Sequence, residues 1–428
     1  MPVSPARAAA FEILLRIESS DAYASELLHS SRFAKLSSAD HGLLTQLVMG
    51  VLRWRSVLDR HIAEHSTERL PKLDIEVLTA LRLGAYQLLF LDRIPTHAAV
   101  NESVELVKQA RKRSAAGMVN AVLRKIKREA ADLNDLSHPQ WLAGRWTQNY
   151  GQEAVRQICA YDQTAPKAAM RADNAALVEE LERAGIGLRP GSFLTKTLVA
   201  TGDITHTKAF LERRLVIQDE ASQLVALLVG KGNAILDCCA APGGKTRIIA
   251  EQNPQATVFA AELQPGRAAL LKKFAACKNI RVITADARQL PLNRKFDRIL
   301  VDAPCTGTGT LARNPEIKWR LKAEDISRLQ IYQLEILAAA MKHVAPGGRL
   351  IYSTCSLEPE ENQEVIEKAL AANGEFRLID CRGELQRLKE NRELALDNSD
   401  SLLSGPYLRT IPGVHSSDGF FAAILERC

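Results

Sequence analysis

The sequence has no apolar stretch long enough to cross a bilayer, so we predict no membrane-spanning helix. Residues 1–7 begin no continuous apolar segment, and we therefore expect no signal peptide. The eight cysteines include no clustered pairs with the spacing of zinc ligands, so we predict no metal site. Because free thiols are typical of a reducing compartment, we expect a cytoplasmic protein without a membrane partner.

A strong excess of either charge is also absent, because 56 Lys and Arg residues stand against 50 Asp and Glu residues, for a net charge of +6. This mild basic excess permits an acidic partner without requiring one. The 428 residues are too many for one ordinary domain and suit two or three. The hydrophobic content of 46% is sufficient for packed cores.

Residues 1–130 carry apolar side chains at helical spacing and show no strand-like alternation. A helix start is expected at Ser37, after which apolar residues recur over several turns. Three more helical stripes begin near Asp74, Thr96 and Met118. The pattern predicts an all-α helical bundle.

A cluster of basic residues lies near the end of this bundle, with no acidic residue between positions 108 and 128. Its members are Lys108, Arg111, Lys112, Arg113, Arg124, Lys125, Lys127 and Arg128. The commoner explanation of such a cluster is a solvated helix face. Because a cluster of one sign is also the expected footprint of phosphate binding, we favour contact with RNA here.

Residues 131–212 form a middle segment whose topology does not follow from its pattern. A strand is expected at residues 166–171, and the whole is predicted as a small α/β segment. Aromatic residues such as Trp146 lie beside basic ones such as Arg145 and Arg171. These aromatic side chains could stack on RNA bases or form a small core.

From residue 213 onward, short apolar runs alternate with turns and helical stretches. The expected strands cover residues 234–237, 257–262, 280–286, 298–301, 349–352 and 419–425. Helical stretches between them include residues 266–276 and 326–344. This alternation predicts an α/β domain with a doubly wound sheet.

The turn after the first of these strands is rich in small residues. It consists of Cys239, Ala240, Ala241, Pro242, Gly243, Gly244 and Lys245. A phosphate-binding Walker loop would need glycine at position 239, and a dinucleotide fingerprint would need glycine at both 239 and 241. The turn therefore disfavours a dehydrogenase, although its small residues still let the backbone approach a ligand.

Acidic residues follow three successive strands, at Glu262, Asp286 and Asp302. Glu262 follows the turn by about twenty residues, where an acid can bind ribose hydroxyls. Asp286 ends the next strand and can accept a hydrogen bond from an adenine amino group. Together with the turn, these acids favour an adenosyl ligand without phosphate, and S-adenosylmethionine fits that description.

Two cysteines, Cys305 and Cys355, each lie just past a predicted strand, beside the turn-forming residues Pro304 and Ser356. Since ligands bind at the carboxyl ends of the strands in such sheets, both thiols should face one crevice. A thiol there can act as a covalent nucleophile, whereas a lone cysteine near a strand is usually buried and inert.

Together, these motifs resemble the RNA cytosine-C5 methyltransferases. The matching strings cover residues 239–245, 302–309, 314–319, 353–356, 359–362 and 418–421. Strings at residues 86–89, 93–102 and 119–124 look like a NusB-like helical domain. The combination is similar to bacterial methyltransferases of the Sun/Fmu type that act on small-subunit (16S) ribosomal RNA. Departures are Glu262, where Asp is usual, and Asp173 in a string that tends to Arg-x-Asn.

The resemblance implies a NusB-like RNA-binding domain at residues 1–130, an RNA-recognition subdomain at 131–212 and a Rossmann-like class I methyltransferase domain at 213–428. It implies a monomer that uses S-adenosylmethionine, held by residues 239–245 with Glu262, Asp286 and Asp302. Alternatives that remain open are another RNA substrate such as transfer RNA, and a non-catalytic RNA-binding factor.

The resemblance also implies roles for the catalytic residues. Cys355 would attack C6 of a cytosine. Asp302 would bind the N3 edge of that base. Cys305 would assist release of the product. Lys245 could favour the thiolate of Cys355 electrostatically, or serve only in cofactor contact and turn structure.

Overall fold

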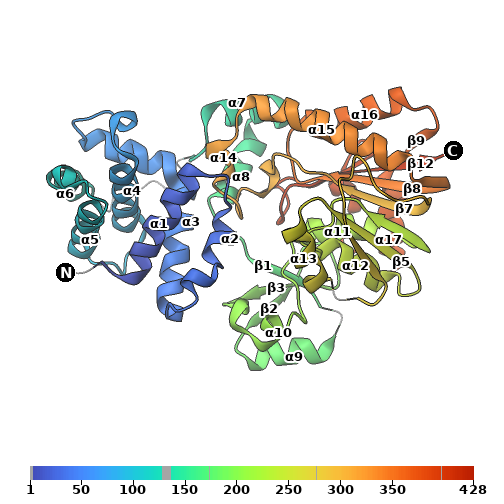
Figure 1. The fold of residues 1–428 in the computed structure, drawn as a ribbon, viewed down its shortest axis with the longest axis horizontal. Coiled ribbons are helices and arrows are strands. Elements are labelled where there is room, and N and C mark those ends of the chain that lie inside the picture. Colours follow the sequence, from blue (N-terminus) through green and yellow to red (C-terminus); the bar gives the residue numbers. More distant parts are fainter. Residues whose placement is uncertain (1–2, 128–135, 173, 276, 397) are drawn as a thin grey trace. The chain divides into compact units, whose positions relative to one another are not determined.

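The computed structural model describes residues 3–127, 136–172, 174–275, 277–396 and 398–428. Two residues considered above, Arg128 and Asp173, lie outside these ranges. The chain divides into two compact units (Figure 1). One comprises Met1–Ala165 with Leu311–Arg320, and the other comprises Pro166–Thr310 with Leu321–Cys428.

The first unit is helical, which confirms the predicted bundle. Its main helices are α1 (Pro5–Ser19), α2 (Ala24–Leu28), α3 (Ser38–His65), α4 (Ile75–Phe90), α5 (Thr96–Gln109), α6 (Ala116–Lys125), α7 (Gln140–Tyr150) and α8 (Gln152–Asp162). The side chain of Ser37 accepts a hydrogen bond from the Asp40 N–H and so caps α3, as the sequence predicts. Apolar side chains of α1 and α3–α6 form one core.

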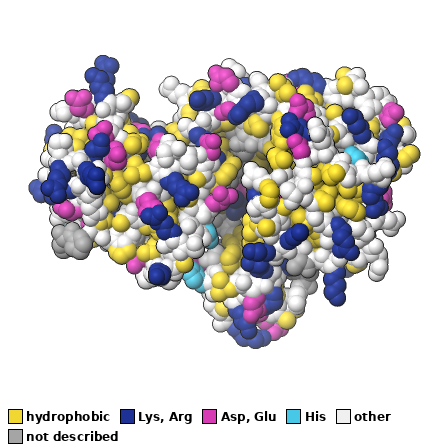
Figure 2. Space-filling model, viewed as in Figure 1, with side chains coloured by type: hydrophobic (Ala, Val, Ile, Leu, Met, Phe, Trp, Pro, Cys, Tyr) yellow, Lys and Arg dark blue, Asp and Glu magenta, His cyan; other side chains and the backbone are white. Residues whose placement is uncertain are grey.

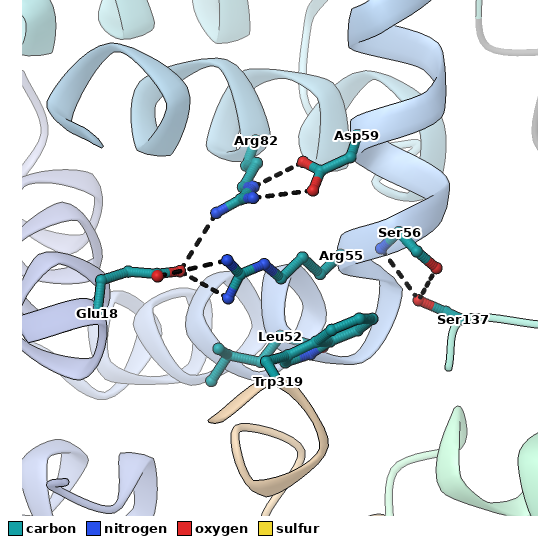
Figure 3. A network of polar contacts seen from close by, with 8 residues as sticks. All are labelled: Glu18, Leu52, Arg55, Ser56, Asp59, Arg82, Ser137 and Trp319. Carbon is teal, nitrogen blue, oxygen red and sulfur yellow. Dashed lines mark hydrogen bonds and ion pairs between the residues drawn. The ribbon is translucent and has the colours of Figure 1, made fainter. Parts of the chain in front are cut away.

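A short segment from the second half of the chain folds with this helical unit. It contains α14 (Ile317–Arg320). The indole N–H of Trp319 donates to the Leu52 carbonyl oxygen over 2.6 Å, and the Arg55 guanidinium lies 5.5 Å from the centre of the Trp319 rings (Figure 3). Arg55 is in turn ion-paired with Glu18 at 2.7 Å. The segment is therefore held by side-chain and backbone groups of the first helices.

The second unit contains a small antiparallel sheet with strand order β1-β3-β2. Its strands are β1 (Ala168–Arg171), β2 (Gly187–Pro190) and β3 (Thr197–Thr201), accompanied by α9 (Ala175–Arg183) and α10 (Lys208–Leu211). Met170, Leu181 and Ala200 lie in its core. The strand expected at residues 166–171 is confirmed as β1.

A nine-stranded sheet dominates the second unit. Its parallel strands, in the order β8-β7-β4-β5-β6, are β4 (Ala234–Asp237), β5 (Thr257–Glu262), β6 (Ile280–Thr284), β7 (Phe296–Asp302) and β8 (Val344–Thr354). The antiparallel strands β12 (Phe421–Arg427), β9 (Phe376–Ile379), β11 (Tyr407–Arg409) and β10 (Leu403–Ser404) extend it beyond β8. The order reverses at β4, which confirms the doubly wound sheet.

Helices cover both faces of this sheet (Figure 1). On one face lie α11 (Glu220–Leu228), α12 (Gly244–Gln252), α13 (Pro265–Phe274) and α17 (Cys381–Glu390). On the other lie α15 (Ala323–Met341) and α16 (Gln363–Ala372). Basic and acidic side chains are interspersed over the visible surface in Figure 2, in keeping with the balanced composition. None of the described helices is both long and apolar enough to cross a membrane.

Candidate functional site

The carboxyl ends of the parallel strands bring the two sequence-predicted cysteines together. Cys305 lies three residues past the end of β7, and Cys355 directly follows β8. These strands are neighbours, with Asp302 paired to Ser353, so the two loops leave the sheet side by side. The two Sγ atoms lie 3.4 Å apart, within hydrogen-bond distance.

This contact changes the acidity of the Cys305 thiol. The hydrogen bond to Cys355 and, next to it, burial raise the pKa of the Cys305 thiol well above its ordinary value. Cys305 therefore keeps its proton at neutral pH and can donate it toward the Cys355 sulfur.

An ion pair lies next to the cysteines. The Lys245 ammonium group lies 2.8 Å from Asp302 Oδ2, and the Ser353 hydroxyl donates to Asp302 Oδ1 over 2.8 Å. Burial disfavours the charge of Lys245, but the Asp302 carboxylate outweighs burial and raises the pKa of the ammonium group. The Lys245 Nζ also lies 4.9 Å from the centre of the Phe420 ring. Lys245 is thus charged at neutral pH.

The small-residue turn connects β4 to α12 and contains a cis peptide bond between Ala241 and Pro242. Gly243 precedes α12 with a φ of 114°, and a Cβ on it would lie 2.8 Å from Leu271 Cδ1. Position 243 therefore requires glycine. Burial raises the pKa of the Cys239 thiol well above its ordinary value, so Cys239 remains a neutral, apolar part of the turn.

The side chain of Asp237, at the end of β4, is hydrogen-bonded to Thr246, the residue that follows this turn. Its Oδ2 accepts a hydrogen bond from the Thr246 hydroxyl over 2.7 Å. Burial raises the pKa of Asp237 to about 7, although the hydrogen bond from Thr246 opposes the shift. Asp237 was not among the site residues predicted from the sequence, since any one acid at a strand end is a weak signal.

Two of the candidate cofactor acids, Glu262 and Asp286, differ in the contacts that their carboxylates already make. Glu262 is 5% exposed, and its Oε1 accepts the Gln264 N–H over 3.0 Å. Asp286 is bound by Arg288, whose backbone and side chain both donate to it, and this pairing lowers the pKa of Asp286. A carboxylate and a small-residue turn at adjacent strand ends fit a ligand with ribose hydroxyls and no phosphate. Glu262 has a weaker basic contact than Asp286, since Arg267 Nη1 lies 4.0 Å from its Oε1.

The described members of the basic cluster lie on α5, on α6, in the loop between these helices and, for Lys127, just past the end of α6. Lys108 pairs with Glu105 at 2.7 Å, and Lys112 pairs with Asp74 at 3.0 Å. Arg124 donates to Asn120. The remaining described members are exposed and form no ion pair with another described residue: Arg111, Arg113, Lys125 and Lys127.

Family models match three successive regions of the chain. Residues 224–426 match the model of the 16S rRNA methyltransferase RsmB/F, and residues 4–128 match the NusB family. Residues 138–204 match the ferredoxin-like domain of RsmF/B-like methyltransferases.

Two relatives that align over most or all of the chain are also named as methyltransferases. A Bacillus subtilis protein named probable ribosomal RNA small subunit methyltransferase B is 34% identical over the full length of both chains. The Vibrio cholerae ribosomal RNA small subunit methyltransferase B is 33% identical, covering 91% of this chain and 90% of its own. The crystal structure of PH0851 aligns over both whole chains with a TM-score of 0.79 at 24% identity. A methyltransferase homologue from Pyrococcus horikoshii aligns over 68% of this chain and 96% of its own, with a TM-score of 0.56 at 26% identity.

The fold and the site define an S-adenosylmethionine-dependent methyltransferase with a NusB-type helical unit. Within that class, the chain belongs to the RsmB/F family of 16S ribosomal RNA methyltransferases.

Proposed function

We propose that this protein methylates C5 of a cytosine in small-subunit ribosomal RNA, through a covalent bond between Cys355 Sγ and C6 of that cytosine. The observation that carries the proposal is the 3.4 Å contact between Cys305 Sγ and Cys355 Sγ at the carboxyl edge of the sheet. A reaction that uses one thiol as a nucleophile and has no elimination step needs no second thiol. A reaction that first adds and later eliminates a thiol can use a second thiol in the elimination.

Cytosine C5 is a poor nucleophile, and thiolate addition at C6 makes it enamine-like. S-adenosylmethionine supplies the methyl group as a sulfonium substituent. Cys355 forms the bond to C6, and the Cys305 thiol and Lys245 stabilise its thiolate beforehand. Asp302 accepts from the pyrimidine edge near N3, held in orientation by Lys245 and Ser353.

After methyl transfer, the proton on C5 must leave so that the C6–sulfur bond can break. We assign Cys305 to this release step, because its sulfur is the group next to Cys355 Sγ. The C5 proton would pass to water, the electron pair of the C5–H bond would restore the C5–C6 double bond, and the Cys355 sulfur would leave as a thiolate that accepts a hydrogen bond from the Cys305 thiol.

For the cofactor, we propose that Cys239, Ala240, Ala241, Pro242, Gly243, Gly244 and Lys245 form the floor of its site. Glu262 would accept the ribose hydroxyls, and Asp286 and Asp302 would border the same site. The support is the glycine-dependent turn together with acids at adjacent strand ends.

RNA binding is assigned in part to the basic cluster of the helical unit, where Arg111, Arg113, Lys125 and Lys127 remain exposed. Because reduced thiols are needed at the site, we propose that the protein acts in the cytoplasm. All proposed catalytic residues come from one unit of one chain, which supports action as a monomer.

The test uses the purified protein with S-adenosylmethionine labelled in its methyl group and two substrates, small-subunit ribosomal RNA and bulk transfer RNA. Bisulfite sequencing then locates any 5-methylcytosine. We expect one dominant modified position in ribosomal RNA, and none with Cys355→Ala. Label in transfer RNA alone would contradict the assigned substrate, and label on a base other than cytosine would contradict the chemistry.

A further inference from the structure

One buried carboxylate contacts both cysteine loops. Glu361 is fully buried at the end of a short 3-10 helix, η7 (Pro359–Glu361), just after the Cys355 loop. Its Oε1 accepts the Thr306 N–H over 2.9 Å, and its Oε2 accepts the hydroxyls of Thr306 and Ser356. Thr306 is the residue after Cys305, and Ser356 is the residue after Cys355.

A third partner fixes the carboxylate from α15. The Gln333 side-chain N–H group donates to Glu361 Oε1 over 2.9 Å and to the Pro304 carbonyl oxygen, also over 2.9 Å. Pro304 is the residue before Cys305. The Cys305 loop is therefore held on both sides of the thiol, by Gln333 before it and by Glu361 after it.

The number of hydrogen bonds that the Glu361 carboxylate can accept matches the number of donors around it. An ionised carboxylate has about four acceptor sites and no donor. The Thr306 N–H, the Thr306 hydroxyl, the Ser356 hydroxyl and the Gln333 amide supply four donors. Burial raises the pKa of Glu361, and the hydrogen bonds from Ser356 and Thr306 oppose this shift. A protonated Glu361 would have to give up one of these acceptor contacts.

Other contacts also join the two loops. The Thr308 hydroxyl oxygen lies 3.4 Å from that of Ser356 and accepts the Leu357 N–H over 2.9 Å. The Gly309 N–H donates to the Cys355 carbonyl oxygen over 2.9 Å, and the Gly419 N–H donates to the Gly309 carbonyl oxygen over 2.7 Å. A Cβ on Gly309 would lie 2.2 Å from the Gly419 carbonyl oxygen, so the approach requires glycine. Glu361 accepts hydrogen bonds from both residues that immediately follow the thiols, and the hydroxyl oxygens of these two residues also lie 3.0 Å apart.

We propose that Glu361 is a positioning residue, whose carboxylate sets the distance between the Cys305 and Cys355 sulfur atoms by binding the residue that follows each cysteine. The positional part of this proposal stands by itself. Its consequence for catalysis rests on the proposed function. Misplacement of a reacting group by about 1 Å can cost roughly 100-fold in rate.

Thiol spacing can be measured without RNA or S-adenosylmethionine. Dibromobimane becomes fluorescent when two thiolates displace both of its bromides, so it reports two neighbouring thiols. Peptide mass spectrometry identifies the bridged pair as Cys305 and Cys355, and Cys305→Ala sets the background. We expect bridging in Glu361→Ala to slow by at least about tenfold, because the loops lose their common acceptor. Glu361→Gln, which keeps one acceptor oxygen, should lie between Glu361→Ala and the unchanged protein.

Methyl transfer supplies the second measurement. For Glu361→Ala we expect kcat to fall by roughly 100-fold, with the affinities for S-adenosylmethionine and RNA unchanged. Glu367→Gln is the matched control, since it removes an exposed carboxylate from α16 and should leave both assays unchanged. Bridging and kcat in folded Glu361→Ala equal to those of Glu367→Gln would overturn the proposal.

If Glu361→Ala shows no thermal unfolding transition, Glu361→Gln decides. Reduced bridging and kcat in this folded variant support positioning, and unchanged values overturn it. The outcomes also separate this proposal from the proposed function. Failure of the unchanged protein to methylate cytosine would contradict the function, while the bridging rates would still decide the role of Glu361.

Discussion

Each unit buries an ionisable side chain whose hydrogen bonds go to neutral groups. In the helical unit this side chain is Lys318, and in the catalytic unit it is Glu361. Lys318 is 1% exposed and donates to the carbonyl oxygens of Arg53 and Ser137. Burial lowers the pKa of Lys318 to about 7, with Asp162 opposing, and burial raises that of Glu361. Both shifts favour the neutral form, so burial alone does not distinguish the two residues.

Their partners do distinguish them. The described hydrogen bonds of Lys318 go to backbone groups of the helical unit, so they hold the segment Leu311–Arg320 in that unit. Those of the Glu361 carboxylate come from the residues beside the two thiols. We therefore expect changes at Lys318 to affect stability, and changes near Glu361 to affect chemistry. The predictions below test this division between the units.

The largest effect should come from Cys355→Ala. Without the attacking thiol, no covalent protein–RNA adduct and no methylation should appear, because C5 is never activated. Denaturing electrophoresis with labelled RNA detects the adduct, and labelled S-adenosylmethionine detects the product. A covalent adduct formed by this variant would show that another residue attacks.

Cys305→Ala should have the opposite effect, because it should retain the attack on C6 and slow the release of the product. Addition and methyl transfer remain available, but release is slowed, so a protein–RNA adduct should accumulate and survive denaturing electrophoresis. The adduct should disappear in the double variant with Cys355→Ala. Normal turnover by Cys305→Ala would remove Cys305 from the release step, whatever its distance from Cys355.

The sequence was sufficient to predict the parallel strands and the convergence of the two cysteine motifs, because strand–turn–helix alternation is a local signal. The short antiparallel strands β9, β10 and β11 were not predicted, since they have few residues and their pairing is non-local. The position of Trp319 in the helical unit depends on Leu52, 267 residues away, and no local pattern could show it.

The contacts of Glu361 could not be predicted from the sequence, for a related reason. Its string, residues 359–362, was matched as part of the family resemblance, but Glu358, Glu360 and Glu361 look alike in a sequence. Which of these carboxylates contacts both cysteine loops depends on the turn of η7 and on Gln333 from α15. Contacts of this kind are set by packing, not by spacing.

The next effect concerns RNA binding by the helical unit. Replacing Arg111, Arg113, Lys125 and Lys127 with neutral residues should weaken RNA binding and flatten its salt dependence, by about 0.7 in slope for each phosphate that is no longer neutralised. Cofactor affinity should not change. Replacing Lys108 and Lys112, which already pair with Glu105 and Asp74, is the matched control and should do less. An unchanged slope would identify the cluster as a solvated face.

A smaller effect is expected at the cofactor acids. Glu262→Ala should weaken S-adenosylmethionine binding by roughly tenfold or more, since a hydrogen bond to a charged group contributes about 1.5–3 kcal/mol. Asp286→Ala should weaken it less, because Arg288 already occupies that carboxylate. Titration calorimetry with both variants decides the order. Equal affinities for Glu262→Ala and the unchanged protein would remove Glu262 from the site.

The last effect concerns stability and is a pH dependence at Lys318. Its pKa is about 7 in the folded protein and 10.5 ordinarily, so the folded state releases this proton first as pH rises. Between about pH 7 and 10.5 the unfolded chain binds more protons, and rising pH therefore stabilises the native state through this group. Lys318→Met removes the group, so the melting temperature of the unchanged protein should rise relative to that of the variant from pH 7 to pH 10.

We expect this relative shift to reach about 10 °C, because a pKa difference of about 3.5 (10.5 less about 7) corresponds to roughly 3–4 kcal/mol between pH 7 and 10, and about 1 kcal/mol to roughly 2–4 °C in a unit of this size. Lys72→Met, at an exposed lysine of the same unit, is the matched control and should show a constant difference across the range. A constant difference for Lys318→Met as well would mean that Lys318 keeps its proton in the folded state. Its ammonium group would then be a charged link to the carbonyl oxygens of Arg53 and Ser137 at every pH tested.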